Sequence, residues 1–304
     1  MQIIKLIAMD FITTTDSQSG KEVKLAYSDY GTGDPVVLIH GWPLSREMWE
    51  YQVAPIIDAG YRVVKYDRRG FGKSSKPYEG YNYDTFAADL NAIMEQLDLR
   101  NATLVGFSMG GGEVARYLSN YGTSRVSRVA LIATVLPYMS KSGDNPEGVD
   151  PSVFEDIKNQ IRKDRINFLD EFGKIFFGVS MMSHPVSKAS LEYYRMLASF
   201  ATQHSTLGCV TAFSETDFRT DIPNITVPAL IIHGDSDKIV PVEVSSDKTA
   251  SMIPGSQYLI YKGAPHGLFL THRDQLNHDL VNFVQGSSNA FSVPLVQTSE
   301  RGAH

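Results

Sequence analysis

The sequence has a single cysteine, Cys209, among its 304 residues. One thiol cannot form a disulfide within the chain, and no group of Cys and His residues has the spacing of a zinc site. We therefore expect no disulfide framework, no metal and no cofactor bound through cysteine. A low cysteine count is typical of a reducing compartment, so we predict a cytoplasmic protein.

Long hydrophobic runs and an excess of basic residues are also missing. The apolar stretch at residues 3–12 is interrupted by Lys5 and Asp10, and no run approaches the about 18 residues of a membrane span. Lys and Arg total 28 against 34 Asp and Glu, which gives a net charge of −6. Nucleic acids and anionic membranes attract basic surfaces. We therefore expect no signal peptide, no membrane association and no nucleic-acid partner.

What the sequence does contain is an alternation of short β-branched runs with longer amphipathic segments. The runs are bounded by Gly, Pro, Asp or Asn, and they predict strands buried on both faces, as in a parallel sheet. The expected strands are 23–28, 36–39, 62–66, 103–107, 129–133, 229–232 and 258–261. The expected helices are 48–59, 83–97, 109–119, 244–252 and 268–284. This alternation predicts an α/β fold with a doubly wound, mostly parallel sheet.

The alternation stops between residues 136 and 223, where the pattern is helical and rich in aromatics. We interpret this stretch as an all-α cap inserted over the carboxyl ends of the strands, with some of its aromatics lining the cavity beneath. The alternative for each aromatic is the core of the cap itself. The predicted organisation is an extension at 1–22 with a polar turn at 13–20, a core at 23–135 and 224–285, a cap at 136–223 and a tail at 286–304.

The sequence Gly106-Phe107-Ser108-Met109-Gly110 lies between an expected strand and a helix with a glycine-rich start. This is the strand–turn–helix context of a nucleophile elbow, in which a serine occupies a tight, strained turn. The flanking glycines are needed because side chains there would collide. We predict that Ser108 is a catalytic nucleophile. The alternative is an ordinary N-cap serine.

A serine hydroxyl needs a base to take its proton. His266 has the best context, in a loop after the strand at 258–261 and before the last helix. His40 precedes Ser108, which is the wrong order for this kind of fold, so we interpret it as a buried brace of its loop. We interpret His233 as structural.

The imidazole in turn needs an acceptor on its other nitrogen. The loop after the strand at 229–232 offers Asp235 and Asp237. We favour Asp237, which is further out toward the open end of the sheet. Asp235, just past the strand, is better placed to close the turn by accepting backbone amides.

A tetrahedral intermediate needs preorganised donors for its oxyanion. We predict that the backbone N–H groups of Met109 and Trp42 supply them, with Pro43 stiffening the loop beside Trp42. The residues expected to line the substrate pocket are Pro43, Phe107, Val135, Tyr138, Phe172, Phe176, Ile239 and Val240.

The glycine-rich segment 67–75 contains Lys73 but lacks the spacing of a phosphate-binding loop. We predict a scaffold loop instead, in which Asp67 pairs with the neighbouring arginines.

Several motifs together resemble one family, the cofactor-free haloperoxidase and arylesterase branch of the α/β-hydrolases. The motifs are His40-Gly41-Trp42-Pro43, 66–74, 106–112, 212–218, 233–241 and 264–267, and the resemblance extends from about residue 23 to 284. It implies a triad of Ser108, Asp237 and His266, oxyanion amides of Trp42 and Met109, and neither haem nor metal.

The resemblance also implies a substrate class. Members of this branch hydrolyse small esters, and many make a peracid from a carboxylic acid and hydrogen peroxide. A proline after the oxyanion tryptophan, here Pro43, accompanies better perhydrolysis. Members often associate, so a homo-oligomer is one expectation.

Three functions stay open at this point. The first is a serine hydrolase of small esters, with hydrogen peroxide as a second nucleophile. A lactone or lactam hydrolase on the same triad is the second, and a non-catalytic ligand receptor on the same fold is the third. A dehalogenase or epoxide hydrolase is disfavoured, because those branches have Asp where Ser108 stands.

Overall fold

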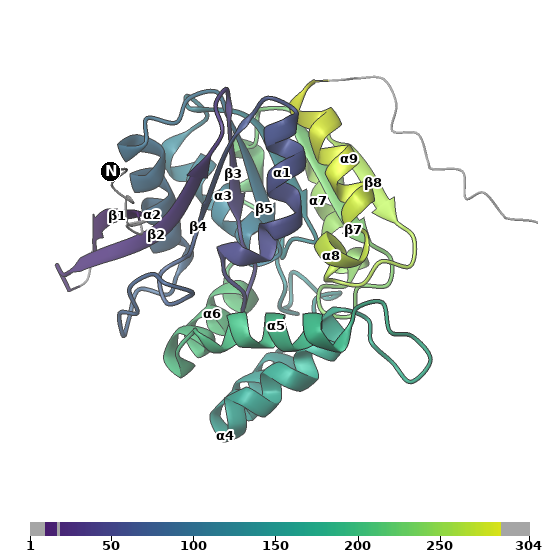
Figure 1. Cartoon of the computed structure of the whole chain (residues 1–304). Helices are drawn as coiled ribbons and strands as arrows, with labels where there is room; N and C mark the ends of the chain where they lie inside the picture. Colours follow the sequence, from purple (N-terminus) through teal and green to yellow (C-terminus); the bar gives the residue numbers. More distant parts are fainter. Residues whose placement is uncertain (1–9, 17–18, 287–304) are drawn as a thin grey trace, which may run out of the picture.

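In the computed structural model, which describes residues 10–16 and 19–286, the strands form one eight-stranded sheet (Figure 1). The strand order is β1-β2-β4-β3-β5-β6-β7-β8, with antiparallel pairing at β1–β2 and β2–β4 and parallel pairing elsewhere. The strands are β1 Asp10–Thr15, β2 Glu22–Tyr30, β3 Pro35–Ile39, β4 Arg62–Tyr66, β5 Ala102–Phe107, β6 Val126–Ile132, β7 Ala229–Gly234 and β8 Gln257–Tyr261. The doubly wound, mostly parallel sheet is therefore confirmed.

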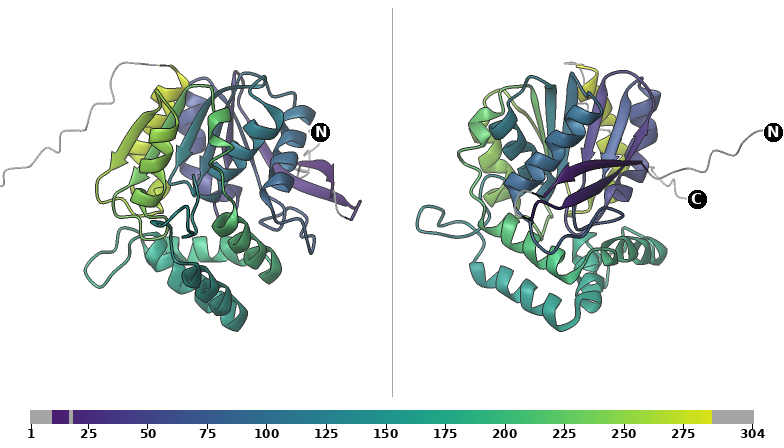
Figure 2. Two further views of the ribbon diagram at one scale, coloured as in Figure 1. Left: turned by 180° about the vertical axis from the view of Figure 1, so that it is seen from behind. Right: turned by 90° about the vertical axis from the view of Figure 1, so that its left-hand side faces the viewer.

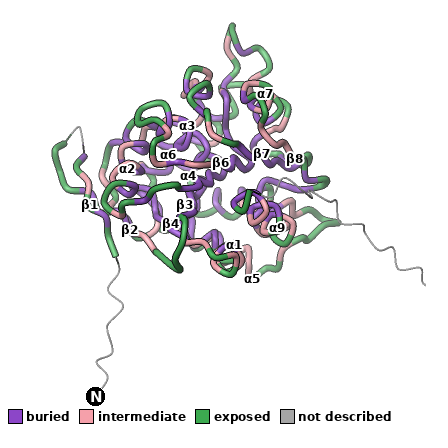
Figure 3. The backbone as a smooth tube through the Cα atoms, turned by 90° about the horizontal axis from the view of Figure 1, so that it is seen from above, coloured by how far each residue is buried: buried purple, intermediate pink, exposed green. Residues whose placement is uncertain are grey.

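The central strands are hydrophobic on both faces because helices cover both sides of the sheet. Every residue of β3, β5 and β7 is buried. Helices α1 and α9 cover one face, and α2, α3 and α7 cover the other (Figure 3). Their bounds are α1 Glu50–Asp58, α2 Tyr83–Gln96, α3 Met109–Tyr121, α7 Ser246–Met252 and α9 Arg273–Val284. No helix in the part of the chain that the structure describes is long and apolar enough to cross a membrane.

Three helices between β6 and β7 lie together beyond the carboxyl ends of the parallel strands (Figures 1 and 2). They are α4 Pro151–Phe176, α5 Lys188–Ser199 and α6 Gln203–Glu215. They lie within the stretch predicted to form the cap. Helix α4 is interrupted at Asp164, whose backbone is not helical and whose carboxylate accepts the amides of the two residues that start the second half.

The polar turn predicted at 13–20 is wrong for its first three residues, which belong to a strand. Residues 10–15 form β1, which pairs with β2 along its whole length. The threonines that suggested a turn are β-branched and suit a strand at the sheet edge. The turn follows at Asp16, whose carboxylate pairs with the buried guanidinium of Arg69 at 2.6 Å and so attaches the segment to the core. Residues 1–9 and 17–18 of the predicted extension and the tail beyond Gly286 lie outside the described residues.

Three of the expected helices are shorter or divided. The segment 268–284 forms α8 (Leu268–Thr271) and α9, because His272 between them is not helical. The segment 48–59 begins as a 3-10 turn, Arg46–Trp49, before α1. The segment 244–252 likewise begins with a 3-10 turn, Val242–Val244, before α7.

Candidate active site

Ser108 occupies a sharp turn between β5 and α3 with φ 53° and ψ −119°. A side chain at a positive φ is strained, and such strain is typical of functional positions. The flanking glycines are sterically required. A Cβ on Gly106 would lie 2.7 Å from the carbonyl oxygen of Gly110, and a Cβ on Gly110 would lie 2.7 Å from that of Ile39. The turn therefore has the geometry predicted for a nucleophile elbow.

Ser108, His266 and Asp237 are joined by hydrogen bonds, although they come from three loops far apart in the sequence. The Ser108 Oγ lies 3.0 Å from Nε2 of His266, and Nδ1 of His266 lies 2.6 Å from Oδ2 of Asp237. An ionised carboxylate can only accept, so Nδ1 carries the proton and Nε2 is free to accept from the serine hydroxyl. All three side chains are at least nine-tenths buried.

The Asp237 carboxylate is fully used as an acceptor. Its Oδ1 accepts the backbone N–H groups of Ile239 at 2.8 Å and Val240 at 2.9 Å. Its Oδ2 faces His266 and, at 3.1 Å, Nε2 of His233. Burial alone would raise the pKa of this carboxyl, but the electrostatic attraction of His266 and the hydrogen bonds from both histidines outweigh burial and hold the pKa well below its usual range. Asp237 is therefore ionised throughout the neutral range.

The two rejected alternatives lie where the sequence interpretation placed them. Asp235 is exposed, and its carboxylate accepts the backbone N–H of Gly263 at 2.6 Å, which closes the turn between two loops. His40 is fully buried beneath its own loop, with Nε2 accepting the backbone N–H of Arg68 at 2.9 Å. Neither has a hydrogen bond to Ser108 or His266 among the described residues.

The imidazole of His266 packs against two aromatic rings that also contact each other. Phe107 comes from the end of β5, with its ring centroid 5.0 Å away, and Phe176 comes from the end of α4, at 4.9 Å. The backbone N–H of Gly267 also donates to the carbonyl of Phe176 at 2.8 Å. The helical insertion thus contacts the loop that carries His266 directly.

The loop with the predicted oxyanion donor packs against the elbow. A Cβ on Gly41 would lie 2.6 Å from the ring of Phe107 and 3.0 Å from Cβ of Ser108, so only glycine allows this approach. The next residue, Trp42, precedes Pro43 through a cis peptide bond. Its indole Nε1 donates to the carbonyl of Thr206 in α6 at 3.2 Å. The backbone of Trp42 and that of Met109, the residue after Ser108, therefore lie on the two loops that meet at the serine.

The sequence analysis did not predict the buried ionic network that lies beneath this loop. Arg68 pairs with Glu113 of α3 at 2.7 Å, and Tyr66 donates to the other carboxylate oxygen of Glu113. Arg68 also donates through Nη2 to the carbonyl of His40 at 2.9 Å. Burial and the charge of Arg68 hold the pKa of His40 well below its usual range, so its ring is neutral.

The expectation that Asp67 pairs with the arginines next to it is wrong. Asp67 instead accepts from the side chain of Arg46 at 3.0 Å and from two backbone amides. Arg69 reaches Asp16 and Asp89. Each arginine thus binds a carboxylate of a different element, which the order of residues within one loop could not show.

The eight predicted pocket residues divide into groups. Pro43, Phe172 and Phe176 line an apolar pocket between the loop of Trp42 and Pro43 and helices α4 and α5. The others do not line that pocket. Val135 is buried, and its N–H lies 3.4 Å from the carbonyl oxygen of Ser108. Tyr138 is covered by the guanidinium of Arg219. Phe107, Ile239 and Val240 surround or support His266 and Asp237, as described above.

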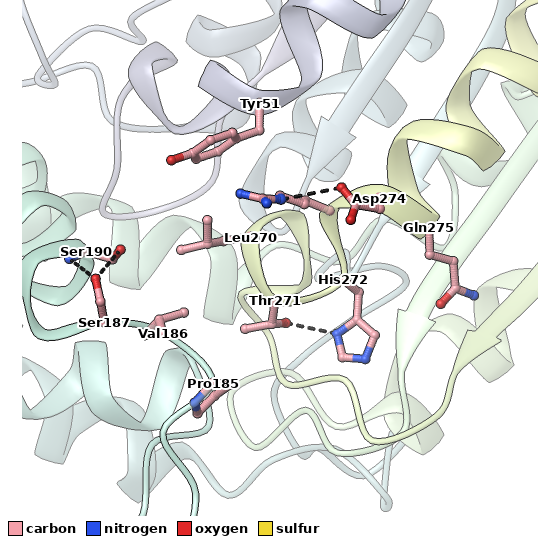
Figure 4. Close-up of a pocket in the computed structure, with 11 residues that line it drawn as sticks. Tyr51, Pro185, Val186, Ser187, Ser190, Leu270, Thr271, His272, Asp274 and Gln275 are labelled. Carbon is pink, nitrogen blue, oxygen red and sulfur yellow. Dashed lines mark hydrogen bonds and ion pairs between the residues drawn. The ribbon is translucent and has the colours of Figure 1, made fainter. Parts of the chain in front are cut away.

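A second, more polar pocket lies away from Ser108, between α1, the start of α5 and the junction of α8 and α9 (Figure 4). Its lining residues include Tyr51, Ser187, Leu270 and His272. They do not include Ser108, His266 or Asp237. Within residues 10–16 and 19–286, no group of three or more His, Cys, Asp or Glu side chains could hold a metal ion.

The model of the alpha/beta hydrolase fold family matches residues 34–273. The chain belongs to this family. A solved bromoperoxidase from Bacillus anthracis is 50% identical, with a TM-score of 0.86, and the match covers 91% of this chain and 100% of that one. A non-heme chloroperoxidase from Kitasatospora aureofaciens is 38% identical over 91% of this chain and 99% of its own length. A bifunctional esterase/perhydrolase from Acinetobacter calcoaceticus is 37% identical over 91% and 100%.

These relatives confirm the α/β-hydrolase fold and the branch that the sequence motifs resemble. The chain is a member of an enzyme family whose named relatives include non-heme haloperoxidases and esterases. The sequence analysis did not predict that His233 contacts Asp237. The signal that could have found its contact is its spacing: it stands four residues before Asp237, at the end of a strand whose following turn brings the two side chains together.

Proposed function

We propose that this α/β hydrolase is a serine hydrolase that cleaves small carboxylic esters through an acyl-enzyme on Ser108. The observation that carries the proposal is the hydrogen-bond chain from Ser108 through His266 to Asp237, with distances of 3.0 and 2.6 Å. Nucleophile, base and orienting carboxylate are the groups that acyl transfer needs, in hydrogen-bond reach of one another.

The reaction follows from these contacts. Ser108 Oγ attacks the ester carbonyl while Nε2 of His266 takes the hydroxyl proton. The backbone N–H groups of Trp42 and Met109 stabilise the oxyanion. His266 then gives its proton to the leaving alcohol, and the acyl group stays on the serine. Water, deprotonated by His266, attacks the acyl group, and His266 returns the proton to Oγ of Ser108 as the carboxylic acid is released. Asp237 holds the imidazole in the required tautomer and stabilises its charged form.

Replacing the nucleophile tests this proposal. Ser108→Ala should lower kcat on p-nitrophenyl acetate by at least about a thousandfold and abolish labelling by a fluorophosphonate. The exposed Ser251 of α7 offers a matched control, since Ser251→Ala removes a hydroxyl that bonds only within its helix. Full activity of Ser108→Ala would contradict the proposal, and a wild-type chain that the fluorophosphonate does not label would favour the non-catalytic receptor.

A second activity, perhydrolysis, is favoured by Pro43 and by the esterase/perhydrolase named among the relatives. Hydrogen peroxide would attack the acyl-enzyme in place of water, and the products are a peracid and free Ser108. We expect peroxide-dependent bromination with acetate that Ser108→Ala abolishes. We also expect Pro43→Leu to lower the ratio of perhydrolysis to hydrolysis. An unchanged ratio would remove Pro43 from the argument.

The acyl group and the assembly are tested separately. A panel of short aryl esters, lactones and lactams, with and without peroxide, distinguishes ester hydrolysis from lactone or lactam hydrolysis on the same triad. The homo-oligomer that the resemblance implies is tested by light scattering of the purified protein. A cytoplasmic location remains our proposal on the strength of the single, buried cysteine.

A further inference from the structure

A second imidazole reaches the carboxylate that orients His266. His233, at the end of β7, is fully buried. Its Nε2 lies 3.1 Å from Oδ2 of Asp237, the same oxygen that accepts from Nδ1 of His266. The reaction described above uses His266 and leaves His233 without a role.

The surroundings of His233 fix which of its nitrogens carries a proton. Nε2 lies 2.9 Å from the carbonyl oxygen of Val240, which can only accept, so Nε2 is protonated and donates. Its N–H is shared between this carbonyl and Oδ2 of Asp237. The other nitrogen, Nδ1, lies 2.6 Å from the hydroxyl of Ser246 in α7. The partners of its two ring nitrogens therefore require that His233 donate an N–H to Asp237.

The four contacts of Asp237 together determine the plane of its carboxylate. The amides of Ile239 and Val240 hold Oδ1, and the carboxylate can turn only about its Cβ–Cγ bond, so the donors on Oδ2 restrain the same rotation. The N–H of His233 is the second donor on Oδ2, beside that of His266. Removing it would leave the 2.6 Å bond to His266 as the only restraint on Oδ2.

We propose that His233 is a positioning residue for the ester hydrolysis assigned to Ser108, acting by fixing Oδ2 of Asp237 and thereby the ring plane of His266. This inference rests on the proposed function. It requires that His233 act through Asp237 alone. The competing explanation is that His233 only stabilises the fold, by linking β7 to α7 through Ser246 and to the following loop through Val240.

A double-mutant cycle separates the two explanations. His233→Leu removes the donor at similar size, whereas His233→Gln keeps an amide N–H that can reach Asp237. We expect His233→Leu to lower kcat about tenfold with KM within about twofold, because a hydrogen bond to a charged group is lost. We expect His233→Gln to recover most of kcat. In an Asp237→Asn background, the same Leu substitution should change kcat by less than about twofold.

Two outcomes would overturn the inference. One is a His233→Leu protein whose kcat stays within about twofold of the wild type. The other is a loss of the same size with Asp237 and with Asn at that position, which is what a purely structural role predicts. If His233→Leu does not fold, Ser246→Ala serves instead: it frees the far side of the same ring and should lower kcat severalfold with Asp237 present and not with Asn. Equal effects would again refute the role.

Failure of the inference is distinguishable from failure of the proposed function. If the function is wrong, Ser108→Ala keeps its esterase activity. If only the inference is wrong, Ser108→Ala is inactive, while His233→Leu either hydrolyses p-nitrophenyl acetate at the wild-type rate or loses the same factor with Asp237 and with Asn at that position.

Discussion

Glu113→Gln should destabilise this hydrolase far more than the loss of an ordinary ion pair, because it leaves the charge of Arg68 buried and unpaired. Both side chains have almost no exposed surface, at 1% for Arg68 and 0% for Glu113, and their charged atoms lie 2.7 Å apart. One further nitrogen of Arg68, Nη1, is buried without a hydrogen-bond partner among the described residues. Neutralising Glu113 therefore leaves the guanidinium with no anionic group in contact.

The expected cost is about 3–5 kcal/mol, the range found when one partner of a buried pair is removed. Against a typical total stability of about 5–15 kcal/mol, this is a large fraction. Arg62 and Asp29 provide a matched control, because their charged atoms also lie 2.7 Å apart but each side chain is 27% exposed. Asp29→Asn should cost about 1 kcal/mol or less, since solvent screens the pair.

Urea denaturation, followed by the far-ultraviolet circular dichroism signal, measures both variants. The double variant Arg68→Met/Glu113→Leu should recover part of the loss, because neither position then holds an unpaired charge. Equal costs for Glu113→Gln and Asp29→Asn would refute the reasoning, since burial would then have no influence on the pair. If the double variant is less stable than Glu113→Gln alone, packing and not the unpaired charge accounts for most of the lost stability.

Three further predictions follow from the same structure. Because burial holds the pKa of His40 well below its usual range, the unfolded chain takes up a proton below about pH 6.5 that the folded protein does not. Stability should thus fall with decreasing pH by up to about 1.4 kcal/mol per unit, and His40→Gln should remove that part of the slope in urea denaturation. Phe176→Ala should cost about 3–5 kcal/mol and lower kcat, whereas Phe154→Ala, which removes a buried ring that packs on Phe213, should cost stability without lowering kcat. Gly110→Ala should destabilise by about 1–3 kcal/mol, since its Cβ would meet main-chain atoms, whereas Gly173→Ala in α4 meets nothing within 4 Å and should stabilise by about 0.5–1 kcal/mol by the same measurement.

The parts of the fold that the sequence could predict are those set by local patterns. Strands such as β3 and β5 are apolar on both faces, which distinguishes a central parallel strand without any knowledge of its neighbours. The turn at Ser108 is similarly local, because its glycines are required by atoms within a few residues or on the adjacent strand. The position of each loop after its strand then places Asp237 and His266 at the same sheet edge.

The parts that could not be predicted depend on partners distant in the sequence. Residues 10–15 form a strand by pairing with β2, and Asp16 after them binds the buried Arg69, but neither partner can be identified from a threonine-rich segment by itself. The pairing of Arg68 with Glu113 joins a loop to a helix on the other side of an entire βα unit. Charge alone indicates that such residues need partners, but it does not indicate which.

The helical insertion contacts the loop that carries His266, and it also lines the apolar pocket beside Pro43. The end of α4 supports His266, through the ring of Phe176 and through its carbonyl, which accepts from Gly267. Helix α5 contributes Leu191 and Tyr194 to the apolar pocket beside Pro43. Substitutions of Phe176 should therefore change both kcat and the preference among esters, because this ring contacts His266 and also lines the pocket. Substitutions of Leu191 should leave His266 in place. If the proposed ester substrate uses this pocket, they should change the relative kcat/KM of different esters with little effect on kcat.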